Sequence, residues 1–211
     1  MDPAELLSRN RDWARATVER DPGYFRRLSG QQSPRYLWVG CSDSRVSADV
    51  ISGLAPGEVF VHRNIGNVVP HADLNVLTVL AYAVDVLEVS HVIVVGHYGC
   101  GGINAALDGK GHGLLDNWLR HIKDVAARHA SQLDALTAEA RSRRLVELNA
   151  VEQAKNLCHT SIVQAAWARG KALTVRAWVY GLEDGLLRDL RFVVNGPEDL
   201  SAAYRLSLED A

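Results

Sequence analysis

The chain has 211 residues, of which 47% are hydrophobic and 23% are charged, a composition typical of globular domains that argues against disorder. Its 23 Lys and Arg residues nearly balance its 25 Asp and Glu residues, for a net charge of -2, so charge gives no reason to expect nucleic acid or an anionic membrane as partner. Because there is no stretch of roughly 20 apolar residues and no secretory signal, and because the three cysteines are too few and too scattered for a disulfide framework, we expect a cytoplasmic protein with reduced thiols.

The first predicted element is an amphipathic helix that starts after Asp2 and Pro3 and ends before Asp21, either continuous or broken in two. Three short runs rich in apolar and β-branched residues then predict strands at 35–41, 58–64 and 91–99. Their nearly continuous apolar character is typical of strands covered on both faces in a parallel sheet.

The segment 73–89, between the second and third strands, is apolar almost all round and predicts a crossover helix buried against the sheet. Two further helices are expected at 114–130 and 137–170, the second ending at Gly170. The segments 173–181 and 187–196 then predict two more strands.

This order predicts an α/β fold with a mostly parallel central sheet, one added edge strand and flanking helices. We expect one domain over 1–211, in which residues 1–30 form a helical arm; packing of the arm on its own domain remains an alternative to packing on a partner subunit. In such folds ligands bind at the carboxyl ends of the strands.

Cys41 follows the first strand, and His97 and Cys100 follow the third. Neighbouring parallel strands would bring these side chains together, and two thiolates with one imidazole suit Zn²⁺ with an open fourth position. Taken singly, the cysteines could be packed small hydrophobes or form a disulfide, and His97 could be a hydrogen-bonded loop residue. No motif surrounds Cys158, which we expect in the core.

The stretches CSDSRV (41–46) and GHYGCGG (96–102) resemble the paired signature of the β-class carbonic anhydrases, and the similarity extends over nearly the whole chain. The resemblance implies one Zn²⁺ per chain held by Cys41, His97 and Cys100. It also implies reversible hydration of CO₂ to bicarbonate and a proton by zinc-bound hydroxide. The expected assembly is a homodimer, with pairing of dimers into a homotetramer.

Asp43 and Arg45 are the expected catalytic pair. Two thiolates neutralise the charge of Zn²⁺ and acidify bound water less than histidines do, so a carboxylate that orients the nucleophile would help. Arg45 can form a forked ion pair with Asp43. Asp43 could also swing onto the metal as a fourth ligand and close the site; an ordinary surface pair is the plain alternative.

Four residues, an indole, a glycine, a guanidinium and a phenol, match those that form a non-catalytic bicarbonate pocket in the bicarbonate-inhibited branch of the family. An indole, a guanidinium and a phenol suit a small planar anion, and bound bicarbonate would favour the closed state. Core packing or an ordinary ion pair could equally explain these side chains. The matching residues are Trp38, Gly40, Arg63 and Tyr180.

Gln32 and Gly101 are the expected substrate-binding residues, although a solvated loop glutamine and a tight turn would explain them too. Tyr82 is expected to pack in its buried helix. Three other functions remain open: a carbon disulfide hydrolase-like relative, a non-catalytic zinc-stabilised module, and a thiol enzyme that uses Cys41 or Cys100 as nucleophile.

Overall fold

The computed structural model describes residues 2–30 and 32–207, which divide into two compact units, Met1–Ser33 and Pro34–Ala211. The first unit contains α1 (Pro3–Arg20) and α2 (Tyr24–Gly30). Asp2 caps α1 by accepting a hydrogen bond of 3.1 Å from the Ala4 N–H, with Pro3 in the first turn. The predicted N-terminal helix is therefore present and continuous up to Arg20, and a second short helix, α2, follows it.

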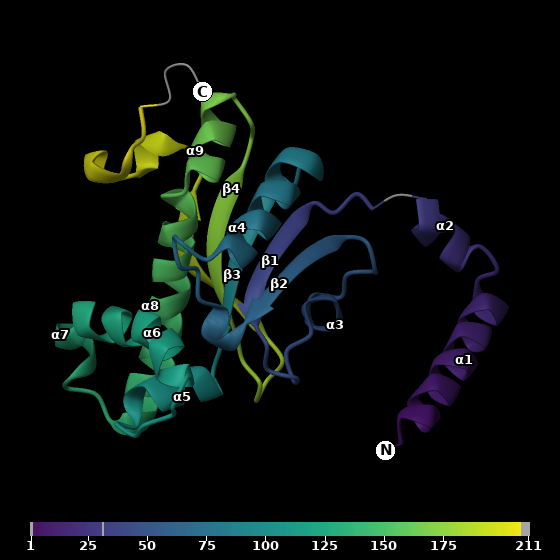
Figure 1. Ribbon diagram of the computed structural model, residues 1–211, viewed down its shortest axis with the longest axis horizontal. Coiled ribbons are helices and arrows are strands. Elements are labelled where there is room, and N and C mark those ends of the chain that lie inside the picture. Colours follow the sequence, from purple (N-terminus) through teal and green to yellow (C-terminus); the bar gives the residue numbers. More distant parts are fainter. Residues whose placement is uncertain (1, 31, 208–211) are drawn as a thin grey trace. The chain divides into compact units, whose positions relative to one another are not determined.

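The second unit is built on a five-stranded sheet with the strand order β2-β1-β3-β4-β5. The strands are β1 (Tyr36–Cys41), β2 (Val59–Asn64), β3 (His91–His97), β4 (Thr174–Tyr180) and β5 (Leu187–Val194). The first four run parallel to their neighbours, and β5 is antiparallel to β4 at one edge (Figure 1). The predicted α/β class, with one added edge strand, is confirmed.

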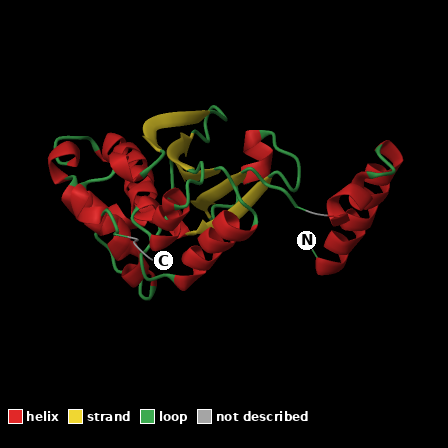
Figure 2. Ribbon diagram, turned by 90° about the horizontal axis from the view of Figure 1, so that it is seen from above, coloured by secondary structure: helices red, strands yellow, loops and turns green. Residues whose placement is uncertain are grey.

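Most helices of this unit lie to one side of the strands (Figure 2). They are α3 (Ala48–Ser52), α4 (Leu74–Ala81), α5 (Gly101–Leu107), α6 (Leu115–Arg128), α7 (Ala130–Leu133), α8 (Ala138–Cys158) and α9 (Ser161–Ala168). One hydrophobic core joins α4, α8 and α9 to the sheet and includes Cys158, as expected. A second core joins α5, α6 and α8 beside the carboxyl ends of the strands.

Two predicted helices differ from the structure. The expected helix over 137–170 is two helices, because the Thr160 hydroxyl accepts a hydrogen bond of 3.3 Å from the Val163 N–H and starts α9. The crossover helix continues beyond α4 as a π-helical turn, Tyr82–Val86. Its Val76, Leu80 and Val84 are buried in the core against the sheet, as expected. Leu74, by contrast, is 77% and Tyr82 44% exposed, so Tyr82 is not fully packed in the helix as expected.

The expectation that strands are covered on both faces holds for β1 and β3, whose residues are almost all buried. It fails for β2, because β2 is an edge strand and Val61 is exposed on it. The short α3 was not predicted. Within the described ranges 2–30 and 32–207, no helix has both the length and the apolar character that a membrane crossing requires.

Candidate metal centre

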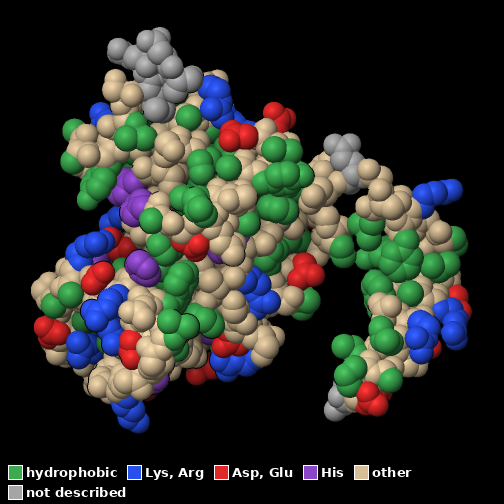
Figure 3. Space-filling view, viewed as in Figure 1, with side chains coloured by type: hydrophobic (Ala, Val, Ile, Leu, Met, Phe, Trp, Pro, Cys, Tyr) green, Lys and Arg blue, Asp and Glu red, His purple; other side chains and the backbone are tan. Residues whose placement is uncertain are grey.

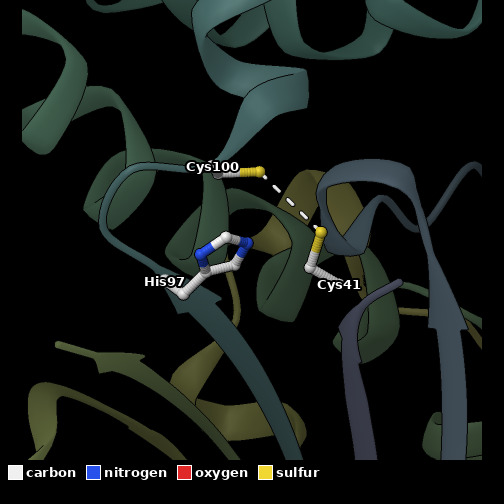
Figure 4. A group of neighbouring side chains, drawn as sticks. All are labelled: Cys41, His97 and Cys100. Atoms are coloured by element: carbon white, nitrogen blue, oxygen red, sulfur yellow. Dashed lines mark hydrogen bonds between the residues drawn. The ribbon is translucent and has the colours of Figure 1, made fainter. Parts of the chain in front are cut away.

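The carboxyl ends of two neighbouring strands bring three potential metal ligands together. Cys41 ends β1, His97 ends β3, and Cys100 directly precedes α5. All three are buried, and one ligand atom from each lies within 4.8 Å of the others. The side chains point toward one another (Figure 4). Both cysteines are free thiols, and their Sγ atoms lie 3.8 Å apart. The structure therefore contains no disulfide between them.

His97 presents one ring nitrogen to this group. Its Nδ1 lies 3.1 Å from the carbonyl oxygen of Tyr98, where an N–H can donate. Its Nε2 is buried and has no hydrogen-bond partner within the described part of the chain. Because a buried polar atom without a partner is costly, and because a metal-binding histidine usually donates its other nitrogen to a carbonyl or carboxylate, this nitrogen fits a metal ion.

The two thiols are not equivalent. Their mutual contact lowers the pKa of Cys41 and raises that of Cys100, since a negative charge on one sulfur is stabilised by the proton on the other. Burial also raises the pKa of both thiols. Backbone N–H groups act in the opposite sense: Gly66 lowers the pKa of Cys41, and Gly102 that of Cys100. The surrounding backbone thus supports thiolates, which are the zinc-binding form.

Asp43 and Arg45 form the expected ion pair. The guanidinium donates from Nε to Asp43 Oδ1 over 2.9 Å and from Nη2 to Oδ2 over 2.7 Å. This fork holds the pKa of the Asp43 carboxyl well below its usual range. The Asp43 Oδ2 atom lies 3.7 Å from His97 Nε2, so the carboxylate borders the ligand group. On its other side, Arg45 lines a cavity of about 410 Å³.

Strand register places the candidate bicarbonate residues on one face of the sheet. Gly40 pairs with Arg63 and with Val95, which in turn pairs with Trp178, two residues before Tyr180. The Trp38 indole lies against Gly40, where it leaves no room for a Cβ atom.

Arg63 has a contact that the sequence did not reveal. It donates to the carbonyl oxygen of Cys41 over 2.8 Å and also to that of Asp43. Arg63 therefore holds the backbone that carries both a ligand and the carboxylate.

The two candidate substrate residues fall in different units. Gln32 is exposed in the N-terminal unit. Gly101 is the first residue of α5, and a Cβ atom there would meet nothing within 4 Å. Gly102 differs, because its Cβ would lie 2.9 Å from Ile65 Cγ2.

The turn Ile65–Asn67 is a feature of the site that sequence reasoning missed. It follows β2 and supplies the Gly66 N–H near Cys41. Gly66 has φ 75° and Asn67 has φ 48°, which puts two consecutive residues in the left-handed region. A glycine followed by an asparagine was the available sequence signal for such a turn.

Comparison with known proteins agrees with this geometry. Residues 36–187 match the family model described as "Carbonic anhydrase". The chain is 45% identical over 205 residues to a carbonic anhydrase of Emericella nidulans, covering 96% of this chain and 90% of that protein. A Coccomyxa β-carbonic anhydrase solved with acetazolamide superposes with a TM-score of 0.89 at 42% identity, covering 94% and 90% of the two chains. A tetrameric β-carbonic anhydrase of Sordaria macrospora gives 0.86 at 40% identity, covering 90% and 98%.

Proposed function

The chain belongs to the β-carbonic anhydrase family, whose members hydrate CO₂, and we propose that Cys41, His97 and Cys100 hold the zinc ion for this reaction. The observation that carries the proposal is the buried Nε2 of His97, which lies among two free thiols and has no hydrogen-bond partner in residues 2–30 and 32–207. When bound in such a site, zinc supplies a Lewis acid that lowers the pKa of water.

Asp43 and Arg45 orient the reacting groups in this proposal. The Arg45 fork uses both carboxylate oxygens of Asp43 from one side, which keeps the carboxylate ionised and fixed in direction. Asp43 Oδ2 then accepts a hydrogen bond from the attacking water and leaves a lone pair of that water aimed at the CO₂ carbon. The 3.7 Å between Oδ2 and His97 Nε2 supports this role.

The test combines metal analysis with stopped-flow CO₂ hydration. We expect one zinc per chain and turnover in the wild type, and loss of both in Cys41→Ser and Cys100→Ser. Zinc without turnover at any pH up to about 9 would instead identify a zinc-stabilised module, in line with Asp43 filling the fourth position. If the wild type binds zinc tightly and both Cys41→Ser and Cys100→Ser lose it, the alternative of a thiol enzyme with Cys41 or Cys100 as nucleophile is also disfavoured. A carbon disulfide assay on the same samples tests the hydrolase alternative.

Asp43 is further proposed to close the site by becoming a fourth ligand when Arg45 releases it. The carboxylate already lies beside His97, and no other side chain of the described residues forms an ion pair with Arg45. Hydroxide competes with a carboxylate for the metal, so the rate should rise steeply at alkaline pH. A rate independent of pH from neutral to alkaline conditions would reject this closed state.

Bicarbonate inhibition at a second site is proposed for Trp38, Gly40, Arg63 and Tyr180. Their common sheet face supports it, and Arg63 links this face to the Cys41 and Asp43 backbone. Bicarbonate that withdraws the guanidinium would loosen that backbone and favour closure. Trp38→Phe and Tyr180→Phe should weaken inhibition with zinc retained; unchanged sensitivity would refute the pocket.

We propose that the chain forms a homodimer and that two dimers pair into a homotetramer, because it leaves large apolar side chains exposed. Leu6, Leu7 and Trp13 of α1 are exposed, as are Leu74 of α4 and Val86 of the π-helical turn that follows it. Hydrophobic side chains gather on the N-terminal unit (Figure 3). Tetrameric Sordaria relatives support this assembly. We propose that the arm packs on a partner subunit and that Gln32 and Gly101 contact substrate there. Light scattering of the full chain and of residues 34–211 tests the arm: the same number of subunits in both assemblies would contradict it.

A further inference from the structure

Three amide side chains form a hydrogen-bonded row along α8. Gln153 Nε2 donates to Asn149 Oδ1 over 3.1 Å, and Asn156 Nδ2 donates to Gln153 Oε1 over 3.2 Å. Asn149 is 0% and Gln153 2% exposed. Burying such groups costs free energy unless every polar atom finds a partner. We call Asn149, Gln153 and Asn156 the amide row.

The remaining hydrogen bonds of the amide row converge on one short segment, residues 65–69. Asn149 Nδ2 donates to the Gly66 carbonyl over 2.8 Å. Gln153 Oε1 accepts from the Val69 N–H over 2.7 Å, and Asn156 Nδ2 donates to the Val69 carbonyl over 3.0 Å. The row therefore fixes the backbone at both ends of a turn more than 80 residues away in the chain.

This turn touches both thiol-bearing segments. Asn64, which precedes it, pairs with Cys41 in the sheet, and its carbonyl accepts from the Ser42 N–H over 2.9 Å. On the other side the turn packs so closely on the start of α5 that a Cβ on Gly102 would lie 2.9 Å from Ile65 Cγ2 and 3.6 Å from Gly66 N. The turn is thus wedged between the backbone that carries Cys41 and the backbone that carries Cys100.

A turn with two successive residues of positive φ needs outside support. Gly66 and Asn67 both have positive φ, and side chains rather than a regular ladder hold the carbonyls around them. The Trp118 indole N–H adds a bond of 2.7 Å to the Ile65 carbonyl. Without the amide row, the Gly66 and Val69 backbone groups would lose these partners, and the turn could shift between the two cysteines.

We propose that Asn149 and Gln153 are positioning residues of the metal centre, which act through the 65–69 turn to hold the Cys41 and Cys100 sulfurs at the spacing a zinc ion requires. This inference rests on the proposed zinc site. Residues that orient metal ligands without binding the metal typically change its affinity about 10- to 100-fold. The amide row is of this kind, although it lies on a helix that supplies no ligand.

The test compares Gln153→Leu with a matched control, Gln164→Leu. Gln164 is also a buried glutamine, 3% exposed. It makes three hydrogen bonds, to the carbonyls of Cys158 and Tyr204 and from the Leu206 N–H. None of these partners belongs to the metal centre. Both substitutions remove one buried amide, so both should lower the stability of the metal-free protein to a similar extent.

Zinc affinity is measured by competition with a chelator, and ligand geometry by the thiolate-to-metal absorption of the Co²⁺-substituted protein. For Gln153→Leu we expect the zinc dissociation constant to rise about 10- to 100-fold and the Co²⁺ absorption to change. For Gln164→Leu both should match the wild type. Equal zinc affinities in the two variants would overturn the inference, whereas a wild type that binds no zinc would overturn the proposed zinc site itself.

Asn156→Ala provides a second, milder variant in case Gln153→Leu does not fold. Asn156 is only partly buried, and this change removes one donor to Val69 and leaves the Gln153 bonds to Asn149 and Val69 in place. We expect the zinc dissociation constant to rise in the same direction, but less than for Gln153→Leu, because two of the row's bonds to the 65–69 turn remain. Affinity identical to that of Gln164→Leu would again contradict the inference.

Discussion

Two adjacent glycines at the start of α5 should respond oppositely to alanine. At Gly102 an added Cβ would lie 2.9 Å from Ile65 Cγ2, well inside the 3.5–4.0 Å at which carbon atoms pack. The Ile65 side chain is β-branched and stiff, and Trp118 holds its carbonyl. Overpacking of this kind costs about 1–3 kcal/mol. At Gly101 the same Cβ meets nothing within 4 Å, so alanine there should stabilise by about 0.4–1 kcal/mol.

The two variants should therefore differ in unfolding free energy by about 1.4–4 kcal/mol, or roughly 3–16 °C in melting temperature for a chain of this size. Urea unfolding of the metal-free proteins measures the difference directly. Metal-free samples separate packing from any loss of zinc. Equal stabilities of Gly101→Ala and Gly102→Ala would show that the 65–69 turn does not press on α5, and would refute the packing argument.

Activity adds an independent readout at Gly101. If its open side faces substrate, the methyl group of Gly101→Ala should lower kcat/KM for CO₂ while the protein unfolds no more easily than the wild type. A kcat/KM equal to that of the wild type would remove Gly101 from the substrate site. It would leave the packing argument for Gly102 untouched.

Zinc removal by a chelator should abolish CO₂ hydration yet leave the far-ultraviolet circular dichroism unchanged, because the core of α4, α8 and α9 excludes all three ligands; loss of helical signal would contradict this. Arg45→Gln should lower stability at neutral pH, since it removes a charged fork from Asp43. Because the folded-state pKa of Asp43 is lowered, this difference should be complete above its ordinary pKa of about 3.9 and shrink as the pH falls toward the folded value. Urea unfolding of metal-free wild type and variant at several pH values checks it, and a gap that widens in acid would contradict the reasoning. Thr160→Ala removes the cap of α9 and should cost about 1 kcal/mol; a change below about 0.3 kcal/mol would show that the cap is not what divides α8 from α9.

The sequence predicted the strands well because each is a short apolar run bounded by polar or glycine residues. It predicted the division between α8 and α9 poorly. The hydrophobic pattern is helical both before and after His159 and Thr160. Hydrophobic periodicity alone does not detect a single capping hydroxyl between two helices. Burial was also overestimated for β2, since the apolar residues of an edge strand and those of a central strand look alike in one sequence.

In the candidate site, the sequence revealed the residues with distinctive chemistry but not the residues that support them. Cys41, His97 and Cys100 could be chosen because thiols and imidazole after parallel strands are chemically distinctive. Asn149 and Gln153 could not, because amides in a helix usually face solvent, and nothing in the sequence connects them to a turn that follows β2. Their partners are backbone atoms of Gly66 and Val69, which carry no signature in the side-chain pattern. A metal centre can therefore be recognised from its ligands, whereas the residues that set the ligand spacing emerge only when each buried polar atom is traced to its partner.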